Sequence, residues 1–144
     1  MIHVPGMKNG GRRADGLVEF VDIYPTVCDA CGVEPPGDLE GVSLLPLMDD
    51  PGRAWKSAAF SQFTRPYLTD QDWEQMGYTV RTKRHRYTEW VDREREVVAR
   101  ELYDYEIAAV ETVNLADRPE HAVLLTRMSD ILHAGWRAAL PSEA

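Results

Sequence analysis

The final third of the chain carries the clearest apolar pattern. Its apolar side chains recur three or four residues apart, which is the spacing of one face of an α-helix. They are Leu124, Leu125, Met128, Ile131, Leu132, Trp136 and Leu140. Asp117, followed by Pro119 and Glu120, resembles a capping box with proline in the first turn. The pattern therefore predicts a helix over 119–140, with His133 at the surface beside the apolar stripe.

A second helix is predicted near the N-terminus, in the segment LVEFVDIYPTVCDACG. Pro25 is compatible with a helix only in the first turn, where the amides lack intrahelical partners. The helix is therefore expected to run over 22–31, with Asp22 as its N-cap and Gly32 as its terminator. The segment MIHVPG before it has the composition of a strand end, and a Pro- and Gly-rich loop with a helical turn over 43–48 follows it.

Between the two helices, short runs of aromatic and β-branched residues predict strands. The four predicted strands span 56–63, 77–81, 86–91 and 101–105. Side chains in the third strand should alternate, with Tyr87, Glu89 and Val91 on one face and Arg86, Thr88 and Trp90 on the other. These elements predict an α+β fold in which a small antiparallel sheet is covered by the last helix. Residues 1–55 are expected to form one part and residues 56–144 a second.

The chain of 144 residues is acidic, with a formal net charge of −8. This balance argues against generic nucleic-acid binding, which needs a broad basic surface. No apolar run approaches the roughly 20 residues of a membrane span, and the N-terminal segment lacks the apolar core of a signal peptide. Positive charge gathers in the predicted hairpin turn, as Arg81, Lys83, Arg84, His85 and Arg86. This basic turn is either a site for a small anion or a solvated hairpin tip.

No segment matches a common catalytic or metal-binding motif. The sequence has no glycine spacing typical of nucleotide binding, no G-x-S-x-G and no H-E-x-x-H. Cys28 and Cys31 form no disulfide framework and have no second pair to complete a zinc site, so they are expected on a buried helix face. SQFTR is similar to a Ser-x-Pro-x-Arg nucleophile motif, but Phe63 replaces the proline, so Ser61 is rejected. No catalytic residue and no metal ligand is therefore predicted in this chain.

Five motifs, taken in order, carry a resemblance to a known family. LVEFVDIYPTVCDACGVEPPGDLEGVSLLPLM contains a V-D-(I/L)-x-P-T motif, an apolar helix and an L-x-G-x-S-L-x-P-L motif. AFSQFTRP, MGYTVRTKRHRYTEW and ELYDYEIAAVETVNLA follow it. Together they resemble the C-terminal part of the sulfatase family, and the aromatic hairpin is most like the iduronate-2-sulfatase branch. Ala108 and Ala109 depart from the family's usual Asp-Pro, so the turn after Tyr105 is expected to differ.

The resemblance implies an alkaline-phosphatase-like enzyme that hydrolyses sulfate esters, with residues 1–55 as the tail of its α/β core and residues 56–144 as its C-terminal subdomain. In that family a formylglycine made from Cys or Ser is the nucleophile, and calcium orients the sulfate. The residues that supply both belong before the start of this sequence. The chain is therefore expected to be the C-terminal portion of a sulfatase, inactive alone, with the missing N-terminal portion as its partner. The alternatives are a non-catalytic binding module derived from a sulfatase, or a segment of a phosphate or phosphonate ester hydrolase of the same superfamily.

The same resemblance implies that C-terminal loops help to line a cleft for an anionic, sulfated substrate. Arginine suits sulfate and carboxylate groups, because its planar guanidinium donates two parallel hydrogen bonds. Tyrosine suits the apolar face of a sugar ring. The proposed substrate-binding residues are Arg65, Arg81, Tyr67 and Tyr78. The alternative for Arg81 is structural, namely an ion pair with Asp22 or Glu89.

Overall fold

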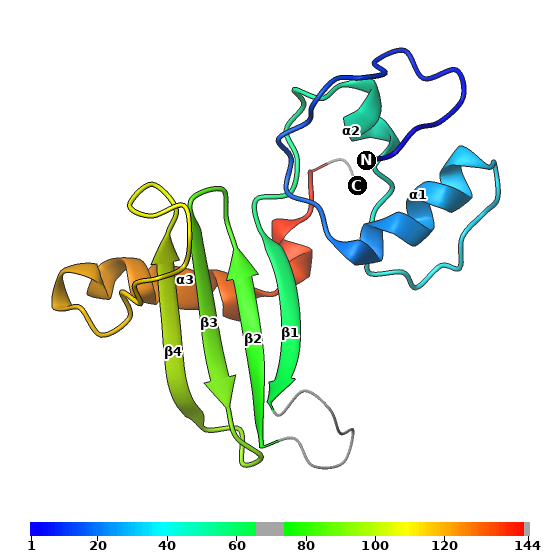
Figure 1. The fold of residues 1–144 in the computed structure, drawn as a ribbon. Helices are drawn as coiled ribbons and strands as arrows, with labels where there is room; N and C mark the ends of the chain where they lie inside the picture. The colour runs from blue at the N-terminus through cyan, green and yellow to red at the C-terminus, as the bar shows by residue number, and fades with distance from the viewer. Residues whose placement is uncertain (66–73, 143–144) are drawn as a thin grey trace. The chain divides into compact units, whose positions relative to one another are not determined.

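The computed structural model describes residues 1–65 and 74–142. It divides the chain into two compact units: residues 1–57 with the chain end from Leu140, and Ala58–Ala139 (Figure 1). The first unit holds two short helices, and the second holds the sheet and a longer helix. No helix among the described residues is long and apolar enough to cross a membrane. The assignment of residues 1–55 to the tail of an α/β core stays a prediction.

The predicted N-terminal helix is present as α1, Ile23–Ala30, with Pro25 in its first turn. Its capping differs from the prediction, because the Asp22 carboxylate bonds to no amide of α1. That carboxylate instead accepts hydrogen bonds from the Glu19 amide at 2.9 Å and the Val42 amide at 3.0 Å. A 3₁₀ turn, Phe20–Asp22, leads into the helix. Asp22 therefore joins α1 to a distant loop and does not simply start the helix.

Two smaller predictions in the first unit need correction. Residues 1–6 form no strand, although their composition is β-prone. The short helix α2 is Leu45–Asp49, two residues later than its predicted start. Ser43 stands outside this helix, where its hydroxyl accepts a hydrogen bond from the Leu45 amide at 3.2 Å and donates one to the Asp29 carboxylate at 2.5 Å.

The second unit contains the predicted four-stranded antiparallel sheet, with strand order β1-β2-β3-β4 (Figure 1). The strands are β1, Ala59–Arg65; β2, Gln75–Arg81; β3, His85–Val91; and β4, Val97–Asp104. The fold class is therefore confirmed as α+β. The start of the last strand was predicted four residues too late, because residues 97–100 are mostly exposed and lack an alternating pattern.

The predicted C-terminal helix over 119–140 is interrupted. Helix α3 is Ala122–Ala134, and 3₁₀ turns of Pro119–His121 and Trp136–Ala139 flank it. Gly135 adopts a φ of +78°, a conformation that glycine tolerates and that ends the α-helix. Asp117 does not cap the helix, because Arg118 is the N-cap of the 3₁₀ turn that precedes α3.

The core of the second unit lies between α3 and one face of the sheet. Met128 of α3 is 1% exposed, and it packs in one cluster with Val80, Tyr87 and Leu102, which are fully buried. Tyr87 belongs to the strand face on which the sequence also places Glu89, and Glu89 bonds to Ser129 and His133 of α3. The alternation predicted for β3 is therefore confirmed. The opposite face of the sheet carries Arg65, Arg81 and Arg86.

Candidate anion-binding site

The sheet surface opposite α3 is called here the arginine face. By strand register it carries Arg65, Arg81, Arg86, Thr88, Trp90, Glu101 and Tyr103. Three arginines on this face stack on aromatic rings. The guanidinium carbon of Arg65 lies 3.7 Å from the centroid of the Trp90 ring, and that of Arg81 lies 3.6 Å from the centroid of Tyr105. Such stacking holds a guanidinium in place without neutralising its charge.

Two of these arginines also meet carboxylates. Arg86 pairs with Glu111 at 2.7 Å and with Glu101 at 3.5 Å, so its charge is largely neutralised. Arg65 reaches Glu101 only at 3.8 Å, and 57% of its side chain is exposed. Glu101 is already the acceptor for the indole N–H of Trp90 at 2.9 Å. Arg65 is therefore the more accessible cation of the two.

Arg81 is held by neutral groups. Its Nη1 donates to the carbonyl oxygen of Thr82 at 2.7 Å and to that of His85 at 3.4 Å. Within the described ranges no carboxylate lies at ion-pair distance from Arg81. The expected alternative, a pair with Glu89, is wrong, because Glu89 lies on the α3 side of the sheet. Arg81 is thus a fixed cation that no acidic side chain described in the structure offsets.

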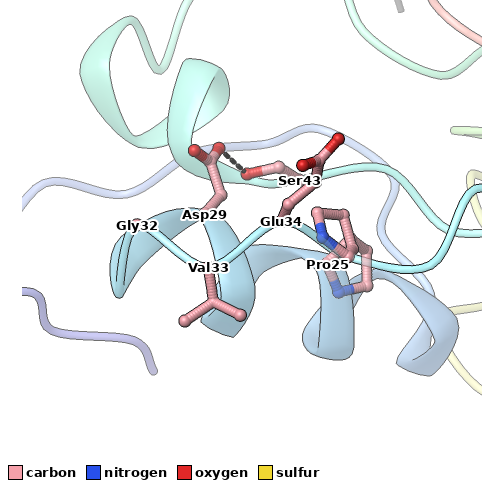
Figure 2. A pocket seen from close by; sticks show the side chains of 7 residues that line it. Pro25, Asp29, Gly32, Val33, Glu34 and Ser43 are labelled. Atoms are coloured by element: carbon pink, nitrogen blue, oxygen red, sulfur yellow. Dashed lines mark hydrogen bonds between the residues drawn. The ribbon is translucent and has the colours of Figure 1, made fainter.

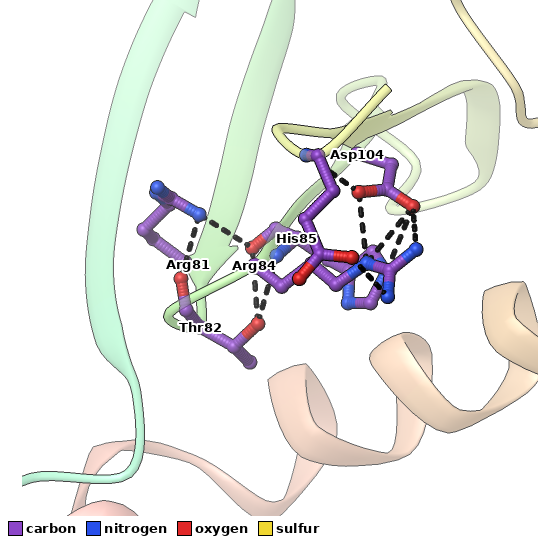
Figure 3. A network of polar contacts seen from close by, with 6 residues as sticks. Arg81, Thr82, Arg84, His85 and Asp104 are labelled. Atoms are coloured by element: carbon purple, nitrogen blue, oxygen red, sulfur yellow. Dashed lines mark hydrogen bonds and ion pairs between the residues drawn. The ribbon is translucent and has the colours of Figure 1, made fainter. Parts of the chain in front are cut away.

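The turn beside Arg81 is tied to the end of β4 (Figure 3). Arg84 donates to the Asp104 carboxylate from Nε at 2.9 Å and from Nη2 at 2.7 Å, and its Nη1 meets Glu106 at 2.6 Å. The hydrogen bonding from Arg84, more than any other contact, holds the pKa of Asp104 well below its usual range. Burial lowers the pKa of His85, whose Nε2 lies 3.5 Å from Asp104.

The basic turn is therefore more than a solvated hairpin tip. Acidic residues of β4 and the segment after it meet Arg84, His85 and Arg86. Lys83 alone among the five basic residues of the turn is exposed with no ion pair in the described part of the chain. The concentration of positive charge is explained largely by these internal pairs.

The four proposed substrate-binding residues do not gather at one point. Arg65 of β1 is in register with Gln75 of β2, and Arg81 lies six residues after Gln75 in β2. At about 3.3 Å per residue the two arginines stand roughly 20 Å apart on the arginine face. Tyr78 points to the α3 side, because it is in register with Glu89, and it is 41% exposed. Tyr67 lies outside the described residues.

Sequence reasoning missed the two rings beneath these arginines. Trp90 was placed on the correct face by alternation, and that alternation was the available signal for its contact with Arg65. Tyr105 was the last residue of the strand predicted over 101–105, so alternation with Tyr103 was the available signal for its face. Its contact with Arg81 also depends on how the turn pairs with the end of β4, which the sequence did not predict.

A hollow of about 470 Å³ lies beside α1 (Figure 2). Its lining includes the carboxylates of Asp29 and Glu34, and it contains no basic side chain. It therefore does not suit an anionic ligand. Elsewhere in the described ranges, no group of three or more His, Cys, Asp or Glu side chains is arranged to hold a metal ion. Cys28 is buried as expected, but the expectation is wrong for Cys31, which is exposed because it follows the last residue of α1. Neither forms a disulfide.

Comparison with known proteins gives matches along nearly the whole chain. Residues 1–137 match the family described as N-sulphoglucosamine sulphohydrolase, C-terminal. The Delta 4,5-hexuronate-2-O-sulfatase of Bacteroides thetaiotaomicron is 29% identical over 136 residues, covering 89% of this chain and 26% of the relative. Human iduronate 2-sulfatase is 32% identical over 110 residues, covering 56% of this chain and 20% of the relative. The chain thus spans about a quarter or less of the length of these relatives.

Solved structures share the fold. A protein in complex with its substrate D-glucosamine-2-N,6-O-disulfate superposes with a TM-score of 0.63 at 26% identity, covering 78% of this chain and 22% of that one. A phosphonate monoester hydrolase of Agrobacterium radiobacter gives a TM-score of 0.61 at 24% identity, covering 81% and 24%, and shows the fold alone. With the family match over residues 1–137, the chain belongs to the sulfatase family, in the group described as N-sulphoglucosamine sulphohydrolase, C-terminal.

Proposed function

We propose that this chain is the C-terminal domain of an enzyme that hydrolyses sulfate esters of glycans. The family match over residues 1–137 carries the proposal. The names of the relatives support the substrate class, since one is a hexuronate-2-O-sulfatase and one solved structure holds a disulfated glucosamine. The iduronate-2-sulfatase branch remains a narrower version of the same proposal.

In this proposal the attacking group and the calcium ion come from the rest of the enzyme. The residues described here offer no ligand cluster for a metal, so no step of the reaction is assigned to one in this chain. The contribution of the chain is to bind and orient the anionic substrate.

Arg65 and Arg81 are the proposed contacts to the substrate. Both are fixed by aromatic rings, and neither is tightly paired with a carboxylate in the described part of the chain. A guanidinium of this kind keeps N–H donors for a sulfate or carboxylate group. Because the two stand roughly 20 Å apart, they would contact different groups of one glycan chain. Tyr67 is kept as a proposed stacking residue, whereas Tyr78 is left out because it lies on the α3 side.

The surface of α1 supports a role within a larger protein. Phe20, Tyr24 and Val27 fall on successive turns and are 91%, 55% and 55% exposed. A contiguous apolar stripe of this kind is typical of an interface. In the proposed enzyme, this stripe would pack against the N-terminal portion.

Two measurements on the purified chain test the proposal. With an aryl sulfate and calcium, the chain alone should show no turnover. In a titration with a sulfated oligosaccharide long enough to span both arginines, the variants Arg65→Gln and Arg81→Gln should each bind more weakly than the unchanged chain. Arg127→Gln, which removes an exposed charge from α3, is the matched control.

Hydrolysis by the chain alone would overturn the assignment of chemistry to the rest of the enzyme. Equal affinity of Arg81→Gln, Arg65→Gln and Arg127→Gln would overturn the arginine face as the binding surface. A neighbouring reading frame that encodes Cys/Ser-x-Pro-x-Arg would support the enzyme, and its absence would favour the binding module.

A further inference from the structure

We infer that Asp104 is a positioning residue, which acts through Arg84 and the β2–β3 turn to hold the guanidinium of Arg81 over the ring of Tyr105. The inference rests on the proposed function, in which Arg81 contacts the anionic substrate. It concerns how that contact is kept ready in the absence of substrate.

Asp104 is built into the end of β4. Its side chain is 3% exposed. Besides two nitrogens of Arg84, it accepts a hydrogen bond from the Glu106 amide at 2.9 Å and lies 3.5 Å from His85 Nε2. A buried carboxylate with this many donors has one stable orientation, so it can serve as a fixed point for the turn.

Arg84 passes this constraint to the turn. Its guanidinium is fixed by Asp104, and its carbonyl oxygen accepts a hydrogen bond from the Tyr105 amide at 3.0 Å. Within the turn, the Thr82 amide donates to the His85 carbonyl at 2.8 Å, and the His85 amide donates to the Thr82 hydroxyl at 3.0 Å. The backbone of residues 82–85 is therefore set both internally and against β4.

The same turn holds Arg81. The carbonyl oxygens of Thr82 and His85 both accept from its Nη1 (Figure 3). The ring of Tyr105 covers one face of the guanidinium. These contacts use only one of its three nitrogens. The N–H groups on Nε and Nη2 make no bond in the described part of the chain, so they are the donors left for an anion.

The effect of Asp104 on binding follows from this arrangement. When only part of the population holds a binding-competent arrangement, the apparent affinity falls in proportion to that fraction. Arg84 is 48% exposed, and without the Asp104 carboxylate its guanidinium keeps only the pair with Glu106, which is itself 69% exposed. It can then turn towards solvent and release the turn. If the competent fraction then drops to about one fifth, the affinity for the anion drops about fivefold.

The test uses the full chain and two separate readouts. The first is the NMR signal of the Arg81 Nε–H group, which the Tyr105 ring current should displace from the position of exposed arginines. In Asp104→Asn this signal should move towards the exposed position, and in Asp104→Glu it should stay displaced. The second is the Kd for D-glucosamine-2-N,6-O-disulfate, which should rise about fivefold in Asp104→Asn. In the Arg81→Gln background, Asp104→Asn should cause no further loss.

The outcomes distinguish the positioning role of Asp104 from the proposed substrate contact of Arg81. An unchanged Arg81 signal in Asp104→Asn overturns the positioning role, whatever the affinity. A signal that moves to the position of exposed arginines while the Kd stays unchanged also overturns it, provided that Arg81→Gln weakens binding. If Arg81→Gln binds as the unchanged chain does, the proposed function of Arg81 is wrong. The NMR measurement still tests whether Asp104 positions Arg81. Should Asp104→Asn not fold, Arg84→Lys replaces it, because lysine keeps the charge but cannot form the two-nitrogen contact.

Discussion

Replacing Glu89 with glutamine should loosen the attachment of α3 to the sheet. The Glu89 side chain is 5% exposed and accepts hydrogen bonds from three groups. The Tyr87 hydroxyl lies at 2.7 Å, the Ser129 hydroxyl at 3.0 Å and the His133 Nε2 at 2.9 Å. Two of these partners belong to α3, so the carboxylate is a polar link between the helix and β3. Glutamine has nearly the same shape but carries no charge.

The magnitude follows from the three bonds. A hydrogen bond to a charged group contributes about 1.5–3 kcal/mol, compared with about 0.5–1.5 kcal/mol for a neutral one. Three weakened bonds would cost about 3 kcal/mol, but glutamine also avoids the cost of burying a charge. We therefore expect a net loss of about 1–2 kcal/mol at pH 7.

The pH dependence gives a second signature. Burial by itself raises the pKa of Glu89, but the hydrogen bonds from Tyr87, His133 and Ser129 outweigh it and lower the pKa below that of an exposed glutamate. A lowered pKa in the folded state contributes stability above the unfolded value of about 4.3, and this is lost as the pH falls through the folded value. The advantage of the unchanged chain should therefore shrink below pH 4 and be absent once Glu89 is protonated.

Urea unfolding followed by tryptophan fluorescence measures both effects. The unchanged chain, Glu89→Gln and the exposed control Glu120→Gln are compared at pH 7 and at pH 3. Glu120 is 63% exposed, and its ion pair with Arg118 is long, at 3.9 Å. Its loss should therefore change the free energy of unfolding little. Equal stability of Glu89→Gln and the unchanged chain at pH 7 would refute the argument, and so would a difference that persists in full at pH 3.

Two further substitutions test other parts of the chain. Gly77→Ala should lower the free energy of unfolding by about 1–3 kcal/mol, because its new Cβ would lie 2.8 Å from Cζ3 of Trp90 and displace the ring that supports Arg65. A urea midpoint equal to that of the unchanged chain would contradict this. Lys56→Met should cost about 3–5 kcal/mol, because it removes the ammonium 2.7 Å from both Glu19 and Asp22 and leaves the fully buried Asp22 without its counter-charge. Thermal unfolding checks it, and a melting temperature equal to that of the unchanged chain would show that other groups offset these carboxylates.

The sequence predicted the strands best where they are buried. In β3, residues 87–90 are buried, and Tyr87 and Arg86 lie on opposite faces as expected. In β4, residues 97–100 are mostly exposed, so burial imposes no alternation and the strand start was missed. The break at Gly135 was missed for the opposite reason. The apolar spacing continues through Trp136, and only the backbone conformation reveals that the helix has ended.

The candidate site was harder to predict, because its contacts join residues that are distant in sequence. Arg84 and Asp104 are 20 residues apart, and their pairing depends on the register of β3 and β4. The sequence identified Arg81 as a candidate from its charge and its place in a hairpin. It could not identify which groups fix the guanidinium, because backbone carbonyl oxygens leave no pattern and the contact with Tyr105 depends on how the turn pairs with the end of β4.

The motifs that place this chain among the sulfatases are explained by packing and not by chemistry. Asp22 accepts a hydrogen bond from the Val42 amide, and Thr26 accepts one from the Leu44 amide at 2.9 Å, so the V-D-(I/L)-x-P-T segment holds the L-x-G-x-S-L segment. Gly41 lies where a Cβ would come within 2.0 Å of the Val21 carbonyl oxygen, which only glycine permits. These residues therefore fix the local backbone. In the proposed enzyme, substrate selectivity should be sought outside these two motifs, on the arginine face.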